Sequence, residues 1–82
     1  MTNEVIWTKI VLERFIEQAN LSEDEEIVIR TRAAGWSRIK QAMELNLSVS
    51  TIDRIISRLK RKYDEVQASD TILPPRQRGV YK

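Results

Sequence analysis

Hydroxyl and cationic side chains gather between residues 37 and 62 of this 82-residue sequence. Serine and threonine hydroxyls both donate and accept hydrogen bonds, whereas arginine presents several donors in a planar fork. Such groups bind phosphates and the edges of nucleic-acid bases, which requires neither a nucleophile nor a proton transfer. The members of this set are Ser37, Arg38, Lys40, Ser48, Ser50, Thr51, Arg54, Arg58, Arg61 and Lys62.

Two residue types on which many enzymes depend are missing. The chain has no cysteine and no histidine, so it lacks the commonest general base, metal ligand and thiol nucleophile. It contains no glycine-rich phosphate loop and no convergent pair of carboxylates. The consecutive acids at residues 23–26 point in different directions on a helix and cannot converge on an ion. We therefore expect no catalytic activity, no cofactor and no metal site.

The charges are unevenly distributed along the chain. Residues 1–34 carry four basic and seven acidic side chains, a net of −3, whereas residues 35–82 carry ten and five, a net of +5. This asymmetry indicates a nucleic-acid-binding face in the second half of the chain. A solvated helix and a basic tail would produce the same excess of positive charge, so charge alone leaves both interpretations open.

Nothing in the sequence predicts insertion into a membrane or export. No segment approaches the about 18 apolar residues of a membrane span. The chain begins Met-Thr-Asn-Glu, without the basic start and apolar run of a signal peptide. The absence of cysteine fits a reducing compartment. The expected location is the cytoplasm, in association with the nucleoid.

Apolar periodicity and capping residues predict an all-α fold, a small bundle of about four helices. The expected helices span residues 8–19, 22–34, 37–45 and 49–67. Ser22 and Glu25 form a capping box at the start of the second helix. Asn20, Gly35 and Asn46 suit the left-handed conformation at helix ends. The predicted domain covers residues 1–67, followed by a flexible basic tail over residues 68–82.

The expected core combines apolar stripes from several helices. The second helix offers Ile27, Val28 and Ile29, and Trp36 is expected to pack on the core rather than to stack on a base. Trp7 is assigned either to the core or to a dimer contact. The fourth helix carries a long apolar stripe, formed by Ile52, Ile55, Ile56, Leu59, Tyr63 and Val66.

The third and fourth helices have the pattern of a helix-turn-helix, over about residues 37–62. Ala42 is small enough for two helices to cross closely. Asn46, Leu47 and Ser48 form a tight turn in which Leu47 points inward and Ser48 caps the next helix. The fourth helix would then place its N-terminal residues in a major groove.

The stretch from Leu21 to about Tyr63 resembles the DNA-binding region 4 of sigma-70-type factors and small helix-turn-helix proteins of phages and mobile elements. Its most specific part is the run Leu-Ser-Val-Ser-Thr-Ile at residues 47–52. One departure is Gln41, where the family has isoleucine, and Ile39 is expected to take its place in the core. The chain has no room for other sigma regions, so the resemblance implies a stand-alone DNA-binding protein.

A recognition helix beginning at Ser48 places specific side chains on its first turns. Ser50, Thr51, Arg54 and Arg58 are the expected contacts to base edges. The expected contacts to the DNA backbone are Ser37, Arg38, Lys40, Ser48, Arg61 and Lys62.

The sequence therefore predicts sequence-specific binding to double-stranded DNA, by a transcriptional regulator from a phage or mobile element. The alternative is a protein-interaction or assembly module, such as a DNA-packaging adaptor similar to a phage terminase small subunit. A homodimer is expected, because one small DNA-binding domain makes few contacts with DNA, but no segment identifies the dimer interface. The resemblance leaves contact with RNA polymerase open, and no residue supports it.

Overall fold

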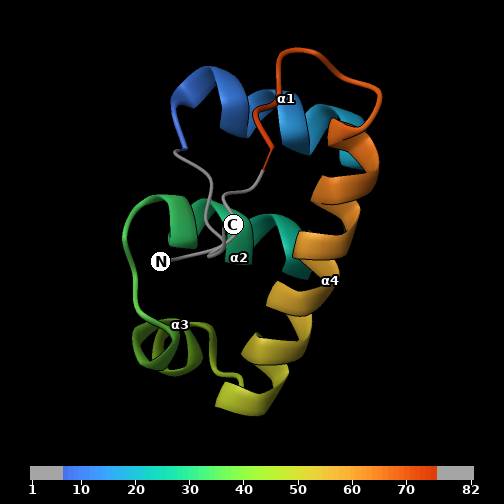
Figure 1. The fold of residues 1–82 in the computed structure, drawn as a ribbon. Helices are drawn as coiled ribbons and strands as arrows, with labels where there is room; N and C mark the ends of the chain where they lie inside the picture. Colours follow the sequence, from blue (N-terminus) through green and yellow to red (C-terminus); the bar gives the residue numbers. More distant parts are fainter. Residues whose placement is uncertain (1–6, 76–82) are drawn as a thin grey trace, which may run out of the picture.

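The computed structural model describes residues 7–75 and contains four α-helices and no strand in that range. The helices are α1 (Lys9–Ala19), α2 (Glu23–Ala33), α3 (Arg38–Leu45) and α4 (Val49–Gln67). The long helix α4 runs along one side of the molecule and packs against each of the other three (Figure 1). The predicted all-α bundle is confirmed. No helix within residues 7–75 has both the length and the apolarity needed to cross a membrane.

The ends of the helices follow from the capping residues. The side chains of Thr8, Ser22, Ser37 and Ser48 each accept a hydrogen bond from the backbone N–H three residues later. Asn20 and Asn46 end α1 and α3 in the left-handed conformation, with φ of 53° and 62°. The end of α2 is closed by hydrogen bonds from the N–H groups of Gly35 and Trp36 to backbone carbonyls of the last turn.

The core lies where the apolar sides of α1, α2 and α4 meet. Phe15, Val28 and Ile52 are fully buried, and Tyr63 is nearly so. Trp7 packs against this core, because its ring lies 5.7 Å from that of Phe15 and 5.6 Å from that of Tyr63. The aromatic rings therefore join the start of the described chain to the C-terminal part of α4.

Two predicted core residues lie on the surface instead. Ile27 is 45% exposed, because three consecutive residues of one helix span too wide an arc for all of them to face the core. Ile39 is 63% exposed, and it is Gln41 that is fully buried. Ile39 and Gln41 lie about 200° apart on the helix, so only one of them can face inward.

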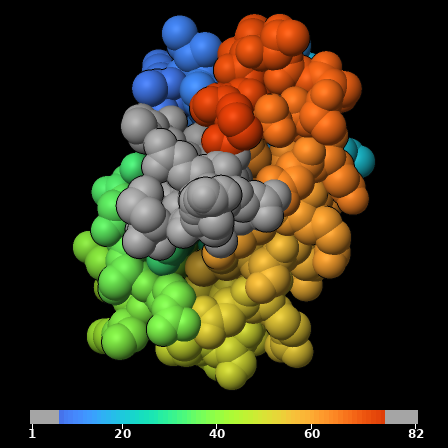
Figure 2. All heavy atoms as spheres, viewed as in Figure 1, coloured from blue at the N-terminus to red at the C-terminus, as the bar shows by residue number. Residues whose placement is uncertain are grey.

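The segment from residue 68 to residue 75, which the sequence assigns to the flexible tail, packs on the core. Leu73 is only 2% exposed, and the hydroxyl of Tyr63 donates a hydrogen bond to the carbonyl of Pro74. Asp70 accepts a hydrogen bond of 2.7 Å from Nε of Arg14 in α1. Figure 2 shows the end of the segment beside α1. The basic residues Arg76, Arg78 and Lys82 of the predicted tail lie outside the described residues.

Candidate nucleic-acid interface

A three-residue connection, Asn46 to Ser48, joins α3 to α4. The carbonyl of Ala42 accepts a hydrogen bond of 2.9 Å from the N–H of Leu47, which holds the turn against α3. Ala42 is 8% exposed, and the side chains of Leu45 and Leu47 pack on the core cluster. The small side chain of Ala42 and this short turn fix where α4 begins.

The first turn of α4 has both engaged and free polar groups. Oγ of Ser48 accepts a hydrogen bond from the backbone N–H of Thr51 at 3.1 Å and donates one to Oγ1 of Thr51 at 2.9 Å. Thr51 is therefore part of the cap and is half-buried, whereas Ser50 is exposed. Among the predicted base contacts of this turn, Ser50 has the more accessible hydroxyl.

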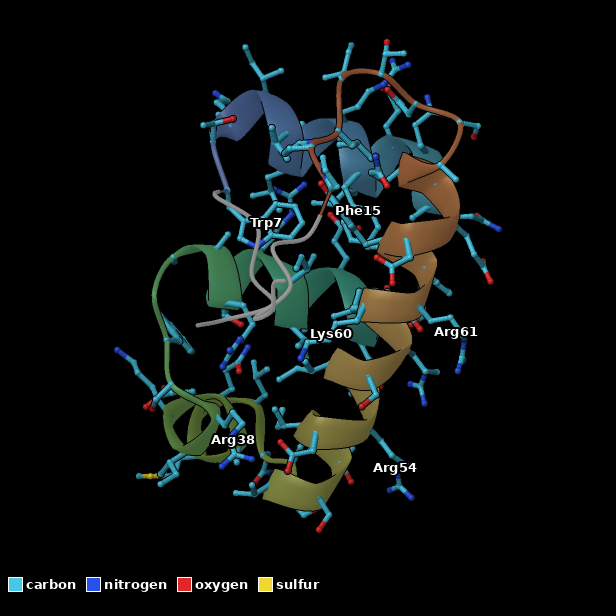
Figure 3. All side chains as sticks on the ribbon, viewed as in Figure 1. Trp7, Phe15, Arg38, Arg54, Lys60 and Arg61 are labelled. Atoms are coloured by element: carbon cyan, nitrogen blue, oxygen red, sulfur yellow. The ribbon has the colours of Figure 1, made fainter. Side chains whose placement is uncertain are left out.

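Arg54 and Arg61 extend from the same side of α4, away from the other helices (Figure 3). They are seven residues apart, two helical turns, and both side chains are exposed. Lys60 is also exposed. None of these three cations has an ion-pair partner within residues 7–75. Arg54 makes one long hydrogen bond, of 3.4 Å, to the hydroxyl of Thr51.

Arg58 and Lys62 are instead bound to the carboxylate of Glu25 in α2. Nε of Arg58 lies 3.2 Å from Oε2, and Nζ of Lys62 lies 2.7 Å from Oε1. The side chain of Glu25 is only 4% exposed, so the two ion pairs join α2 to α4 at a buried carboxylate. Burial alone would raise the pKa of Glu25, but hydrogen bonds from Lys62, the Ser22 backbone and Arg58 lower it to about 2.

The cations of α3 also have partners. Nη1 of Arg38 lies 2.7 and 2.8 Å from the two carboxylate oxygens of Asp53, so the pair links the first turn of α3 to α4. The ammonium of Lys40 lies 4.6 Å from the centre of the Trp36 ring. Trp36 is half-buried, and Ser37 is exposed and occupied as the cap of α3.

The predicted contact residues therefore fall into two groups. Ser50, Arg54 and Arg61 are exposed and lie on the outward face of α4. The others have roles within the fold, as caps or in ion pairs and ring contacts: Ser37, Arg38, Lys40, Ser48, Thr51, Arg58 and Lys62. Lys60 was missed by the sequence analysis, although its basic character and its place in α4 were sufficient signals.

No acidic cluster within residues 7–75 has a geometry that would hold a metal ion. The acids of the first turn of α2 diverge, since Glu25 faces α4 while Glu26 pairs with Arg30 at 2.9 Å. No protein-family model, curated protein or solved structure matches this chain. The resemblance to sigma region 4 therefore rests on the sequence motif alone.

Proposed function

We propose that this protein binds double-stranded DNA in a sequence-dependent way, as a helix-turn-helix protein with α4 as its recognition helix. The observation that carries the proposal is the outward face of α4, where Ser50, Arg54 and Arg61 are exposed and neither arginine has an ion-pair partner within residues 7–75. An arginine near the start of such a helix can bond a guanine edge with two parallel hydrogen bonds.

The connection between α3 and α4 supports this proposal. Asn46 turns the chain in the left-handed conformation, and Ser48 caps α4 through the N–H of Thr51. The remaining unpaired N–H groups and the positive end of the helix dipole at this N-terminus favour a nearby phosphate. Ser50 and Arg54 are thereby presented at the end of the helix that would enter the groove.

The roles divide between base contact and backbone contact. Ser50 and Arg54 are assigned to base edges, and Arg61, two turns farther along, is assigned to a phosphate. Arg58 and Lys62 also lie in α4, but each binds Glu25 and would have to share its charge between that carboxylate and the DNA. A regulator of transcription from a phage or mobile element is the class that the sequence resemblance suggests.

The test is selection of bound fragments from a random pool of double-stranded DNA, with the folded full chain. We expect a defined site to be enriched. On that site, Arg54→Ala should weaken binding about 5- to 150-fold, corresponding to about 1–3 kcal/mol for a bidentate base contact. On unrelated DNA the same variant should lose far less affinity.

The matched control is Lys9→Ala, which also removes one positive charge but lies at the start of α1. Its affinity for the selected site should stay within about twofold of wild type, because it is outside the α4 face. No enrichment and no retained fragment at low salt, with circular dichroism showing a folded protein, would reject DNA binding. Equal losses for both variants would reject the assignment of Arg54 to a base.

A further inference from the structure

The helix α3 presents large apolar side chains to solvent. Ile39 is 63% exposed and Met43 is 73% exposed. They are four residues apart, so they lie side by side on one face of the helix. Half-buried Trp36 precedes the cap of α3, and the ammonium of Lys40, the residue after Ile39, lies 4.6 Å from the centre of its ring. We call Trp36, Ile39 and Met43 the α3 stripe; large apolar side chains that are exposed next to one another are typical of an interaction surface.

The α3 stripe is separate from the outward face of α4. The flank of α3 that meets α4 is marked by Ala42, which is buried, and by Arg38, which binds Asp53. At about 100° per residue, Ala42 lies about 60° from Ile39 and about 100° from Met43 around the helix, and Arg38 lies farther still from both. A ligand on the α4 face therefore leaves the stripe open to a protein partner.

We propose that the partner is a second copy of this chain, with the two α3 helices packed antiparallel about a two-fold axis. The argument is charge complementarity at the edge of the stripe. Lys40 and Glu44 are exposed and four residues apart, as Ile39 and Met43 are. In the antiparallel pair, Ile39 meets Met43 of the second copy while Lys40 meets Glu44 of the second copy, and each contact occurs twice.

This pattern fits its own copy better than a partner of a single charge. A uniformly acidic partner would meet Glu44, and a uniformly basic one would meet Lys40, with like charges facing each other in either case. An antiparallel copy brings an opposite charge to both positions at the same spacing. The interface is therefore isologous, meaning that each copy contributes the same surface.

The size of the stripe sets the strength of the association. A stable dimer usually buries about 1,200–2,000 Å² in total, and two helices of eight residues provide a small contact by that measure. The dimer is therefore weak and forms at high protein concentration. Its two-fold axis places the α4-facing flanks of both copies on one side, which suits a palindromic DNA site; this consequence alone rests on the proposed function.

Sedimentation equilibrium of the full chain without DNA, over a series of concentrations, is the first test. Wild type should change reversibly from monomer to dimer. Ile39→Glu should weaken the dimer at least tenfold, because it places a charge in the apolar contact. The matched control is Ile10→Glu, at a position of α1 that is 72% exposed, and it should leave the dimer unchanged.

A charge exchange separates the intermolecular pair from effects within one helix. Lys40→Glu and Glu44→Lys should each weaken self-association, since like charges then face each other across the two-fold axis. Mixing the two variants in equal amounts should restore the dimer, because every contact at the rim again joins opposite charges. A monomeric wild type, a dimer unaffected by Ile39→Glu, or a mixture that fails to associate would each overturn the proposal, whatever the result with DNA.

Discussion

Glu25 shows how one carboxylate can serve several structural roles. Its Oε1 accepts a hydrogen bond of 3.0 Å from the N–H of Ser22, which closes the capping box of α2. The same carboxylate binds Arg58 and Lys62 of α4. Glu25 is buried while both cations are partly exposed, so only the negative charge is removed from water. Its contribution to stability therefore depends on Glu25 remaining ionised.

The low pKa of Glu25 predicts a pH-dependent contribution to stability. The pKa falls from 4.5 to about 2 in the folded chain, so the contribution is complete above pH 4.5 and is lost as the pH falls toward 2. We expect Glu25→Gln to lower the free energy of unfolding at pH 7 by about 2 kcal/mol. The difference from wild type should shrink as the pH falls through this window, measured by urea denaturation.

Glu23→Gln is the matched control for this prediction, since Glu23 is exposed in the same first turn of α2. Glu23→Gln should lower the free energy of unfolding by no more than the few tenths of a kcal/mol expected for a charge near a helix N-terminus. A constant difference between Glu25→Gln and wild type from pH 7 to pH 2 would contradict the role assigned to the Glu25 carboxylate.

Gln41 marks the limit of what single residues reveal in the sequence. Its amide donates hydrogen bonds to the carbonyl of Val28 at 2.9 Å and to Oγ1 of Thr31 at 2.7 Å, which joins α3 to α2. The Oε1 atom is buried with no hydrogen-bond partner within the described residues. Hydrophobicity favours Ile39 for this place, but the turn fixed by the Ser37 cap directs position 41 inward. Pairing with a distant helix is not visible in local periodicity.

At the scale of the element, local signals were sufficient. The predicted caps and stops hold at Thr8, Ser22, Ser37, Ser48 and Asn46, because capping depends on residues within one turn. The segment 68–75 was not predictable in this way. It has no helical period, and its place on the core depends on distant contacts of Leu73 and Asp70.

The left-handed turn at Asn46 gives a prediction at this scale. With φ of 62°, Asn46→Gly should change the free energy of unfolding little, whereas Asn46→Ala should lower it by about 1 kcal/mol. Asn20, with φ of 53° at the end of α1, is a matched position and should show the same order of substitutions. Equal stability of the alanine and glycine variants at position 46, in urea denaturation, would contradict the assigned conformation.

The packing of the segment after α4 gives a second prediction for an element. Leu73 is 2% exposed within the core cluster, so Leu73→Ala should destabilise the protein by about 2–4 kcal/mol. Ile72→Ala, at a position 49% exposed, is the matched control and should cost much less. Thermal unfolding followed by circular dichroism measures both. Equal effects of the two variants would show that residues 68–75 do not contribute to the core in solution.

At the scale of the whole molecule, ion pairing decides which cations remain available. Arg14, Arg30, Arg38, Arg58 and Lys62 each bind a carboxylate. The sequence predicts the excess of basic residues in its second half but not this division, because the carboxylates that bind Arg58 and Arg38 lie 33 and 15 residues away. The cations of α4 without such a partner within residues 7–75 are Arg54, Lys60 and Arg61.

This division predicts how salt should weaken the proposed DNA binding. Each phosphate contact contributes about −0.9 to the slope of log K against log salt concentration. If Arg61 binds a phosphate, Arg61→Ala should make the slope less steep by about 1 and should weaken binding to all sequences alike. Lys9→Ala, with the same change in net charge, should leave the slope as it is. Fluorescence anisotropy with labelled DNA over a salt series measures both, and equal slopes for wild type and Arg61→Ala would remove Arg61 from the interface.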